Sequence, residues 1–215
     1  MVVKDMTFRK LDRKWFLLEN SKDIKKINRL FHLKKSKYPI LTFAYIDHEE
    51  GISLRILGPI EVVNKELFLN EKLISKRLDI IRYSEMENLE LSLVPDAIIK
   101  KIKYTIDVID EMNGYYTNKE VVKTRENVKL DNDRDLIMPD NIKFLALGED
   151  KKREFLTGRI DGYDEETGYY IVSILEKPKL DFGIKVMDKV ILKYVDRPNY
   201  QGLALVKKFC SEDIK

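Results

Sequence analysis

Five short apolar segments, separated by turns that contain glycine, fill the C-terminal third of the chain and limit most strongly what it can fold into. They are Ile142–Leu147, Phe155–Gly162, Tyr169–Leu175, Val186–Val195 and Leu203–Phe209. Each segment has the length of one strand, and glycine gives the backbone the freedom that tight turns between strands require. The spacing therefore predicts a small all-β barrel or sandwich in this part of the chain.

The residues before these segments mix strand and helix patterns. Residues 40–46 form an almost uninterrupted β-rich run, which is typical of a buried strand, and residues 52–57 alternate until Gly58-Pro59 breaks the pattern. Apolar residues recur at helical spacing over 96–112. We therefore expect an α+β protein: an N-terminal mixed α/β domain over residues 1–128, a linker rich in Asp and Asn at 129–141, and a small barrel-like domain over 142–210.

A basic amphipathic helix is predicted after Ser21, whose hydroxyl could cap the first turn. Ile24 and Ile27 recur at helical spacing and mark an apolar face, and Pro39 ends the element. Cationic residues occupy the other side and the residues that follow: Lys22, Lys25, Lys26, Arg29, Lys34, Lys35 and Lys37. This distribution predicts a helix that buries one face and offers the other to an anionic partner.

The charge of the chain is distributed unevenly, although its net value is only +3. Residues 1–40 carry 12 Lys and Arg against 4 Asp and Glu, a net +8, whereas residues 41–140 sum to −6 and residues 141–215 to +1. Such asymmetry is an argument about partners, and it indicates nucleic acid, an acidic protein face or a membrane surface. A helix face that merely solvates the protein is the alternative interpretation.

Several classes of protein are excluded by what the sequence lacks. The single cysteine, Cys210, rules out an internal disulfide, and no stretch of 18 apolar residues or signal peptide is present, so we expect a cytoplasmic protein without a membrane span. No phosphate-binding glycine loop and no serine hydrolase motif occurs. Asp47-His48-Glu49-Glu50 is interpreted as a charged turn. We assign no catalytic residue, no metal site and no cofactor.

Two resemblances to known families were weighed. Pro139-Asp140 followed by Glu149-Asp150-Lys151 resembles the Pro-Asp…Glu-x-Lys signature of a large endonuclease family, which would imply a metal-dependent nuclease. The predicted barrel is similar in size to the PilZ barrels that bind cyclic dinucleotides. The Arg-x-x-x-Arg and Asp-x-Ser-x-x-Gly motifs of those barrels are missing here, so the resemblance implies a shared architecture at most.

The sequence therefore favours a non-catalytic binding or regulatory protein that associates with nucleic acid. Lysines neutralise phosphates, and the aromatic side chains of small barrels stack on bases. The candidate contact residues are Lys22, Lys25, Lys26, Arg29, Lys34, Lys35, Lys193, Tyr194 and Arg197. One alternative is a protein–protein adaptor that uses the basic helix and an edge strand of the barrel, and a second is the metal-dependent nuclease.

Overall fold

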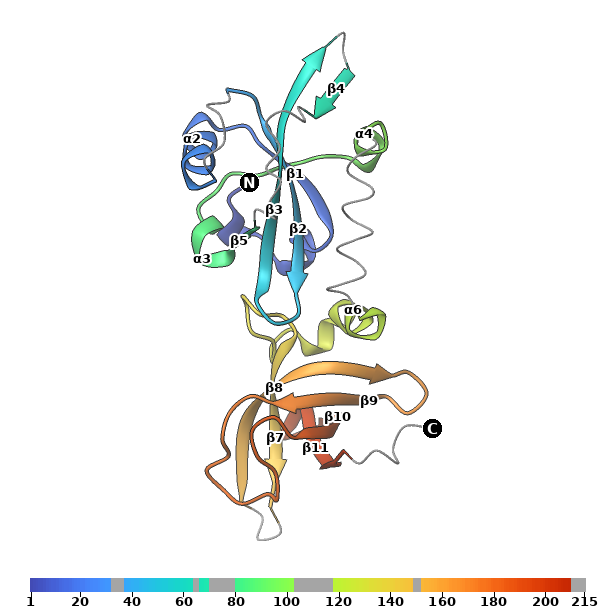
Figure 1. The fold of residues 1–215 in the computed structure, drawn as a ribbon. Helices are drawn as coiled ribbons and strands as arrows, with labels where there is room; N and C mark the ends of the chain where they lie inside the picture. Colours follow the sequence, from blue (N-terminus) through green and yellow to red (C-terminus); the bar gives the residue numbers. More distant parts are fainter. Residues whose placement is uncertain (32–36, 64–65, 70–79, 103–117, 149–151, 210–215) are drawn as a thin grey trace. The chain divides into compact units, whose positions relative to one another are not determined.

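The computed structural model describes residues 1–31, 37–63, 66–69, 80–102, 118–148 and 152–209. Helices and strands are both present, and the chain divides into two compact units, Met1–Tyr116 and Thr117–Lys215 (Figure 1). Each unit is described by itself below. Within the described residues, no helix has the length and apolar character needed to cross a membrane.

The N-terminal unit is built on a six-stranded sheet in the order β4-β3-β2-β1-β6, with β5 also paired to β3. Its strand pairs are antiparallel. The strands are β1 (Lys14–Leu18), β2 (Ile40–Asp47), β3 (Gly51–Val63), β4 (Glu66–Leu69), β5 (Ile80–Arg82) and β6 (Ser92–Leu93). The helical elements are η1 (Val3–Asp5), α1 (Phe8–Leu11), α2 (Ser21–Leu30), α3 (Tyr83–Met86) and α4 (Asp96–Ile99).

Both faces of this sheet are covered, so its central strand is apolar on both sides. Every residue of β2 is buried, which confirms the buried strand predicted from residues 40–46. One face packs against α1, α2 and α3 through Leu11, Ile27 and Met86, among other residues. The opposite face carries Trp15 and Phe43, with Ile99 of α4 against them. Covering on both faces explains why β2 shows no polar alternation.

The break predicted at Gly58-Pro59 is wrong, because β3 runs through it as one strand. The register with β2 shifts there: Thr42 pairs with Ile56 and Leu41 with Gly58, which leaves Leu57 as the extra residue of a bulge. A bulge bends a strand without ending it, and glycine adopts the unusual backbone that the bend requires. Beyond the bulge, residues 60–63 of β3 pair antiparallel with β4.

Several predicted elements reach residues that lie outside the described part of the chain. The helix predicted over 96–112 is represented by α4, and its residues from 103 onward are not described. Residues 71–79 are not described, and β5 begins at Ile80. Ser92 and Leu93 form a short strand, β6.

The C-terminal unit contains five strands in a closed ring, β10-β11-β7-β8-β9. The five apolar segments predicted as strands form this ring: β7 (Asn141–Leu147), β8 (Arg153–Asp164), β9 (Tyr169–Ile174), β10 (Lys189–Arg197) and β11 (Tyr200–Lys208). The pairs are antiparallel except for β11 with β7, which are parallel and close the ring. Phe144, Val172 and Leu192 belong to its buried interior.

Residues 129–141, which we predicted to be a linker, are grouped with the C-terminal unit. The helix α6 (Lys119–Glu126) contacts β8, and η3 (Val128–Leu130) places Leu130 in the core of the ring. Arg134 and Asp140, in the middle and at the end of the predicted linker, are buried. The division therefore falls between Tyr116 and Thr117, before the residues whose Asp and Asn content suggested a boundary.

Candidate functional site

The helix α2 has the amphipathic form that the sequence predicts, but its cap is Asn20 and not Ser21. The Asn20 Oδ1 atom accepts a hydrogen bond from the backbone N–H of Lys22 at 2.9 Å. Ile24 and Ile27 are buried against the sheet. The helix ends at Leu30, earlier than predicted, and Lys34 and Lys35 lie outside the described residues.

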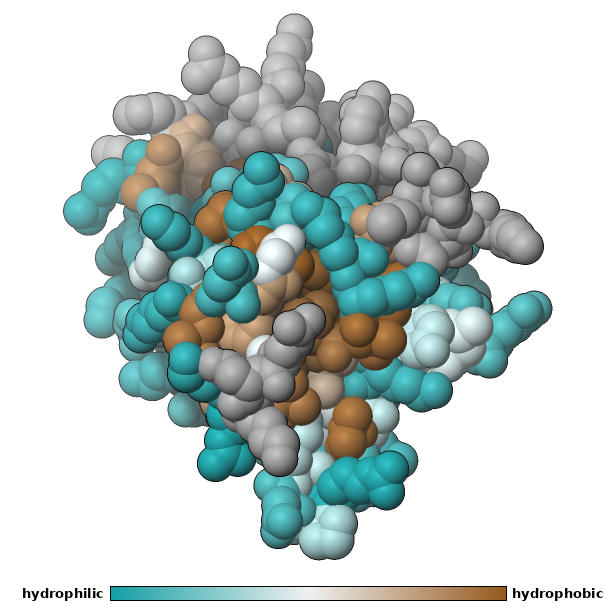
Figure 2. All heavy atoms as spheres, turned by 90° about the horizontal axis from the view of Figure 1, so that it is seen from below, coloured by the Kyte–Doolittle hydropathy of each residue, from teal (hydrophilic) through white to brown (hydrophobic). Residues whose placement is uncertain are grey.

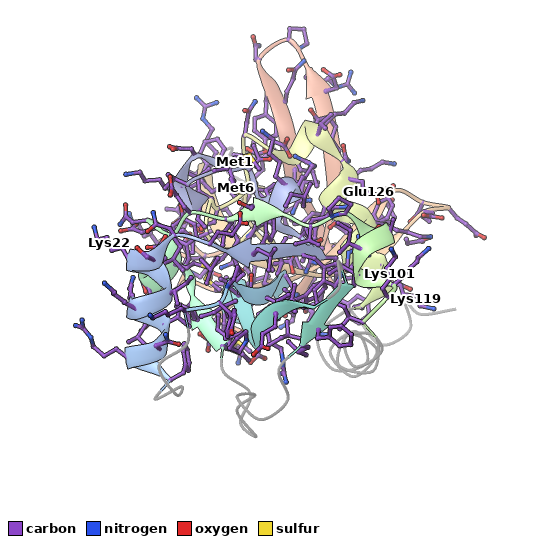
Figure 3. The ribbon with its side chains drawn as sticks, turned by 90° about the horizontal axis from the view of Figure 1, so that it is seen from above. Met1, Met6, Lys22, Lys101, Lys119 and Glu126 are labelled. Carbon is purple, nitrogen blue, oxygen red and sulfur yellow. The ribbon has the colours of Figure 1, made fainter. Side chains whose placement is uncertain are left out.

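Four cationic residues, Lys22, Lys25, Lys26 and Arg29, form the exposed side of α2, which we call the basic face. At 3.6 residues per turn these four positions lie within about 100° of arc. Figure 3 shows Lys22 at the first turn of the helix. The Lys26 ammonium donates a hydrogen bond to the carbonyl oxygen of Glu85, so this lysine also holds α2 against the residues of α3.

The only acidic residue of α2, Asp23, is turned away from the basic face. Its side chain is buried, and its Oδ2 atom accepts a hydrogen bond from the backbone N–H of Glu90 at 3.0 Å. Within the part of the chain that the structure describes, Lys22, Lys25 and Arg29 form no ion pair with a carboxylate. The charges on the basic face of α2 are therefore all positive.

The other predicted contact residues lie on β10 of the C-terminal unit. The Lys193 ammonium lies 5.1 Å from the centroid of the Tyr169 ring, and the two residues are cross-strand partners. Tyr194 is half-buried, with the Lys129 ammonium 5.7 Å from its ring centroid. Arg197 is exposed at the end of the strand. The structure thus brings a cation and an aromatic ring together at Lys193 and Tyr169.

An acidic side chain lies on the same outer surface of the ring and lowers its positive charge. Asp161 Oδ2 accepts a hydrogen bond from the Ser173 hydroxyl at 2.5 Å and lies 3.4 Å from the Lys189 ammonium. Ser173 pairs in register with Arg159 on one side and with Lys189 on the other. The ring is therefore a weaker candidate for an anionic partner than α2.

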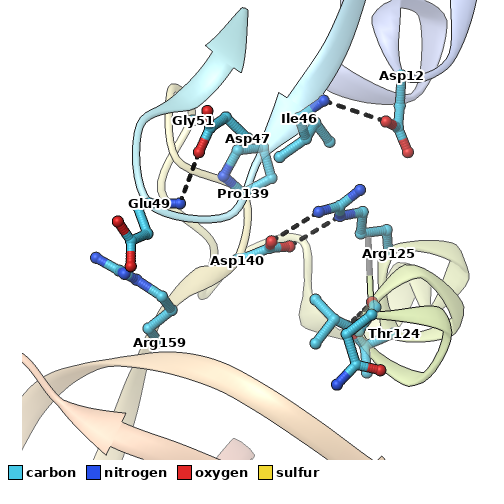
Figure 4. A network of polar contacts seen from close by, with 12 residues as sticks. Asp12, Ile46, Asp47, Glu49, Gly51, Thr124, Arg125, Pro139, Asp140 and Arg159 are labelled. Atoms are coloured by element: carbon cyan, nitrogen blue, oxygen red, sulfur yellow. Dashed lines mark hydrogen bonds and ion pairs between the residues drawn. The ribbon is translucent and has the colours of Figure 1, made fainter. Parts of the chain in front are cut away.

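Asp140, the aspartate of the nuclease-like motif, forms a buried ion pair (Figure 4). Asp140 and Arg125 form two contacts, Nε to Oδ1 at 2.9 Å and Nη2 to Oδ2 at 2.7 Å, and their side chains are 2% and 4% exposed. Arg134 donates hydrogen bonds to the carbonyl oxygens of Thr124 and Pro139, next to the two members of this pair. Glu149, Asp150 and Lys151 lie outside the described residues. The contacts around Asp140 hold α6 to the start of β7.

In the N-terminal unit, the Asp47 carboxylate is likewise held by hydrogen bonds and an ion pair. Its carboxylate accepts hydrogen bonds from the backbone N–H groups of Glu49 and Glu50 at 3.0 and 3.2 Å, the first of which is visible in Figure 4. The Arg82 guanidinium lies 3.0 Å from its other oxygen. This is the charged turn that the sequence predicts. Among the described residues, no group of three or more His, Cys, Asp and Glu side chains is placed to hold a metal ion.

Another acidic residue of the C-terminal unit, Asp133, is held beside a tyrosine. Gly202 has a φ of 153°, and an added Cβ would lie 2.8 Å from Tyr200 Oη and 2.9 Å from Asp133 Oδ2. Burial raises the pKa of Asp133. Burial, together with the Asp133 charge, raises the pKa of Tyr200 to about 12. The Tyr200 hydroxyl donates a hydrogen bond to the carbonyl oxygen of Leu203, which stabilises its protonated form.

Apolar side chains gather at one end of the ring. Figure 2, which looks at the molecule from below, shows them in the middle of this face with polar side chains around them. An open pocket of about 690 Å³ lies between the end of β7 and the residues before β10. It is lined by Leu147, Gly148, Lys152, Leu180, Asp181, Phe182, Gly183 and Leu205. Its lining combines apolar groups with one cation and one acid, which does not define the charge of a ligand.

Comparisons with known proteins add no family to this description. No protein-family model, no curated protein and no solved structure matches the chain. The function must therefore be argued from the residues and contacts described above. The basic face of α2 is visible in the sequence, whereas the pairing of Arg125 with Asp140, which are 15 positions apart, has no signal there.

Proposed function

We propose that the protein is a non-catalytic nucleic-acid-binding protein that contacts the phosphate backbone through the basic face of α2. Lysine and arginine side chains on an exposed helix can approach consecutive phosphates and displace their counterions. Binding of this kind has little dependence on base sequence and weakens steeply as salt is added. The proposal accounts for the concentration of positive charge in the first 40 residues.

The observation that carries the proposal is the single sign of this face. Lys22 and Lys26, and Lys25 and Arg29, are like-charged neighbours one helical turn apart, and each such pair destabilises a helix by about 0.2–0.5 kcal/mol. A mixture of acids and bases would solvate the helix equally well and would stabilise it. The one acid available, Asp23, is instead used inside the unit. Lys26 makes one internal contact, to the Glu85 carbonyl, and the cost in helix stability of keeping Lys22, Lys25 and Arg29 beside it is expected of a binding surface.

The ring supplies a second surface suited to single-stranded nucleic acid. Lys193 and Tyr169 combine a cation with an aromatic ring, and Arg197 is exposed at the end of the same strand. In small barrels, aromatic side chains stack on bases while cations follow the backbone. Tyr194 contributes less, because it is half-buried. We therefore assign affinity mainly to α2 and a smaller preference for unpaired bases to Lys193 and Tyr169.

The adaptor alternative is weakened in one of its two elements. It required the barrel to present an edge strand, but the five strands close into a ring, which β11 and β7 complete by pairing at two positions. Pairing with a partner strand is available only at an edge. The alternative then reduces to an acidic protein that binds the basic face. Such a protein would occupy the same surface that we assign to nucleic acid.

The test is the salt dependence of binding to fluorescent single- and double-stranded DNA and RNA of about 20 nucleotides, measured by anisotropy with the full chain. The variant K22Q/K25Q/R29Q removes three charges from the basic face and keeps Lys26, which bonds to the Glu85 carbonyl. The control K100Q/K101Q/K177Q removes three exposed charges elsewhere. For double-stranded DNA, each lost phosphate contact lowers the slope of log K against log salt by about 0.9.

We expect the basic-face variant to reduce that slope by about 2 to 3 for double-stranded DNA, since three contacts are lost. The control should stay close to the unaltered protein. Equal losses in the two variants would show that net charge acts without a defined surface and would refute the proposal. Absence of binding at low salt would also refute it, and an acidic protein would then be the partner to search for.

A further inference from the structure

A small pocket in the N-terminal unit combines an apolar interior with positive charge. Its volume is about 380 Å³, within the range of roughly 300–1,000 Å³ that is common for small-molecule sites. The lining residues are Met1, Met6, Arg9, Lys10, Lys14, Phe16 and Leu93. None of these lining residues is acidic. The pocket involves none of the residues of the basic face of α2.

The register of the sheet explains why this pocket forms. Lys14 and Phe16 are two positions apart on β1, so their side chains point to the same face. Phe16 pairs with Leu93, the last residue of β6. β6 contains only two residues, and Val94 after it donates a hydrogen bond from its N–H to the Trp15 carbonyl, so on that side of β1 the described sheet pairs no residue with Lys14. Arg9 and Lys10 come from α1, which precedes β1.

The apolar part of the pocket is accessible to solvent. Met1 is 60% exposed and Leu93 is 54% exposed, while Phe16 is fully buried and forms the floor. Figure 3 shows Met1 and Met6 next to each other over the sheet. Exposed apolar surface of this kind is stabilised when a ligand covers it, by about 25 cal/mol for each Å² removed from water. The interior therefore favours an aliphatic or aromatic group.

The rim of the pocket is positively charged. Lys10 and Lys14 are exposed, and the Arg9 guanidinium lies 4.5 Å from the centroid of the Phe8 ring, which orients it. Three cations beside an apolar floor complement a ligand with one negative end and one apolar end. We propose that this pocket binds a small amphipathic anion, namely a monomeric carboxylate with a short apolar tail, and that Arg9, Lys10 and Lys14 hold the carboxylate.

The methionine methyl groups give a direct readout of this site. Of the six methionines, Met1 and Met6 line the pocket, whereas Met187 is 70% exposed in the other unit. The full chain with ¹³C-labelled methionine methyls would be titrated with hexanoate, octanoate and decanoate at pH 7, below their micellar concentrations. M6L assigns the Met6 signal. Octan-1-ol serves as the uncharged probe, and vesicles of phosphatidylglycerol test whether the anion must belong to a membrane.

We expect octanoate to shift the Met1 and Met6 signals and to leave Met187 unchanged. Affinity should rise up to about fourfold for each added methylene that becomes buried. K10Q/K14Q should lower octanoate affinity about three- to tenfold, and K100Q/K101Q, with the same loss of charge, should not. Octan-1-ol should bind more weakly than octanoate. K22Q/K25Q/R29Q should bind octanoate normally, so failure of the nucleic-acid proposal would leave this one standing.

Three results would overturn the proposal. Shifts of Met187 without shifts of Met1 and Met6 would place the ligand at the other unit. Equal affinity for octanoate and octan-1-ol would show that the cations do not hold the carboxylate. Binding to phosphatidylglycerol vesicles without any binding of the monomeric carboxylates would make the site a membrane contact. Folding of each variant would be checked from its dispersed methyl spectrum.

Discussion

Removal of the Asp140 carboxylate is expected to destabilise the C-terminal unit strongly. In Asp140→Ala the Arg125 guanidinium, which is only 4% exposed, loses both of its contacts to the carboxylate. Leaving one member of a buried ion pair without its counter-charge costs about 3–5 kcal/mol. The carboxylate also joins α6 to the start of β7, so the variant should loosen this junction first.

An exposed ion pair of the same length supplies the matched control. Lys123 and Glu165 approach to 2.7 Å, as Arg125 and Asp140 do, but their side chains are 55% and 61% exposed. Exposed pairs contribute about 0–1 kcal/mol, because water screens the charges. Glu165→Ala should therefore change the free energy of unfolding by less than about 1 kcal/mol. The two pairs differ in burial and in the number of contacts, which is two for Arg125 with Asp140 and one for Lys123 with Glu165.

Urea unfolding followed by far-ultraviolet circular dichroism measures both effects. The double variant Arg125→Met/Asp140→Leu should be more stable than Asp140→Ala, because apolar side chains of similar volume avoid the cost of an unpaired buried charge. Our reasoning would be refuted if Asp140→Ala and Glu165→Ala lowered the free energy of unfolding equally. It would also be refuted if the double variant were the least stable of the three.

Three further substitutions test other parts of the structure. Asn20→Ala should lower the free energy of unfolding by about 1 kcal/mol, because the first turn of α2 loses its cap, and urea unfolding against Ser21→Ala would show which residue caps the helix. Gly158→Ala should cost about 1–3 kcal/mol in the same assay, since its Cβ would lie 2.3 Å from Val172 Cγ1, and an unchanged midpoint would contradict the packing of the ring. The pKa of Tyr200 is raised from 10.0 to about 12 in the folded protein, so the unfolded chain loses this proton first and stability should fall as pH rises from 10 to 12. In Tyr200→Phe the free energy of unfolding should fall less between pH 10 and 12. Tyrosinate absorbance in an alkaline titration should show that the variant has lost one tyrosine of high pKa.

The strands of the ring and the buried strand β2 could be predicted because their signals are local. Apolar runs bounded by glycine gave all five ring strands within a few residues of their ends. The predicted cap of α2 was displaced by one residue, from Ser21 to Asn20. Asn and Ser cap helices about equally well, so composition alone could not choose between neighbours.

The domain boundary could not be predicted from composition. Residues 129–141 are polar and rich in Asp and Asn, which is typical of a linker. In the folded chain their polarity serves an internal purpose, since Asp140 pairs with Arg125, and Arg134 bonds to two backbone carbonyls. A buried ion pair and an exposed charged loop have the same composition. Only the positions of the partners distinguish them.

One of the two candidate binding sites is determined by the local sequence, and the other by the tertiary structure. The basic face of α2 follows from the sequence by itself, because helical periodicity sets which side chains share a face. The pocket beside β6 follows only from tertiary structure, because its floor and rim come from the residues on either side of η1 and from α1, β1 and β6, and strand pairing decides that Leu93 lies next to Phe16. Interactions between near neighbours are fixed by the local period of the chain. Contacts between distant residues depend on register and on the closing of the sheet, which no local pattern contains.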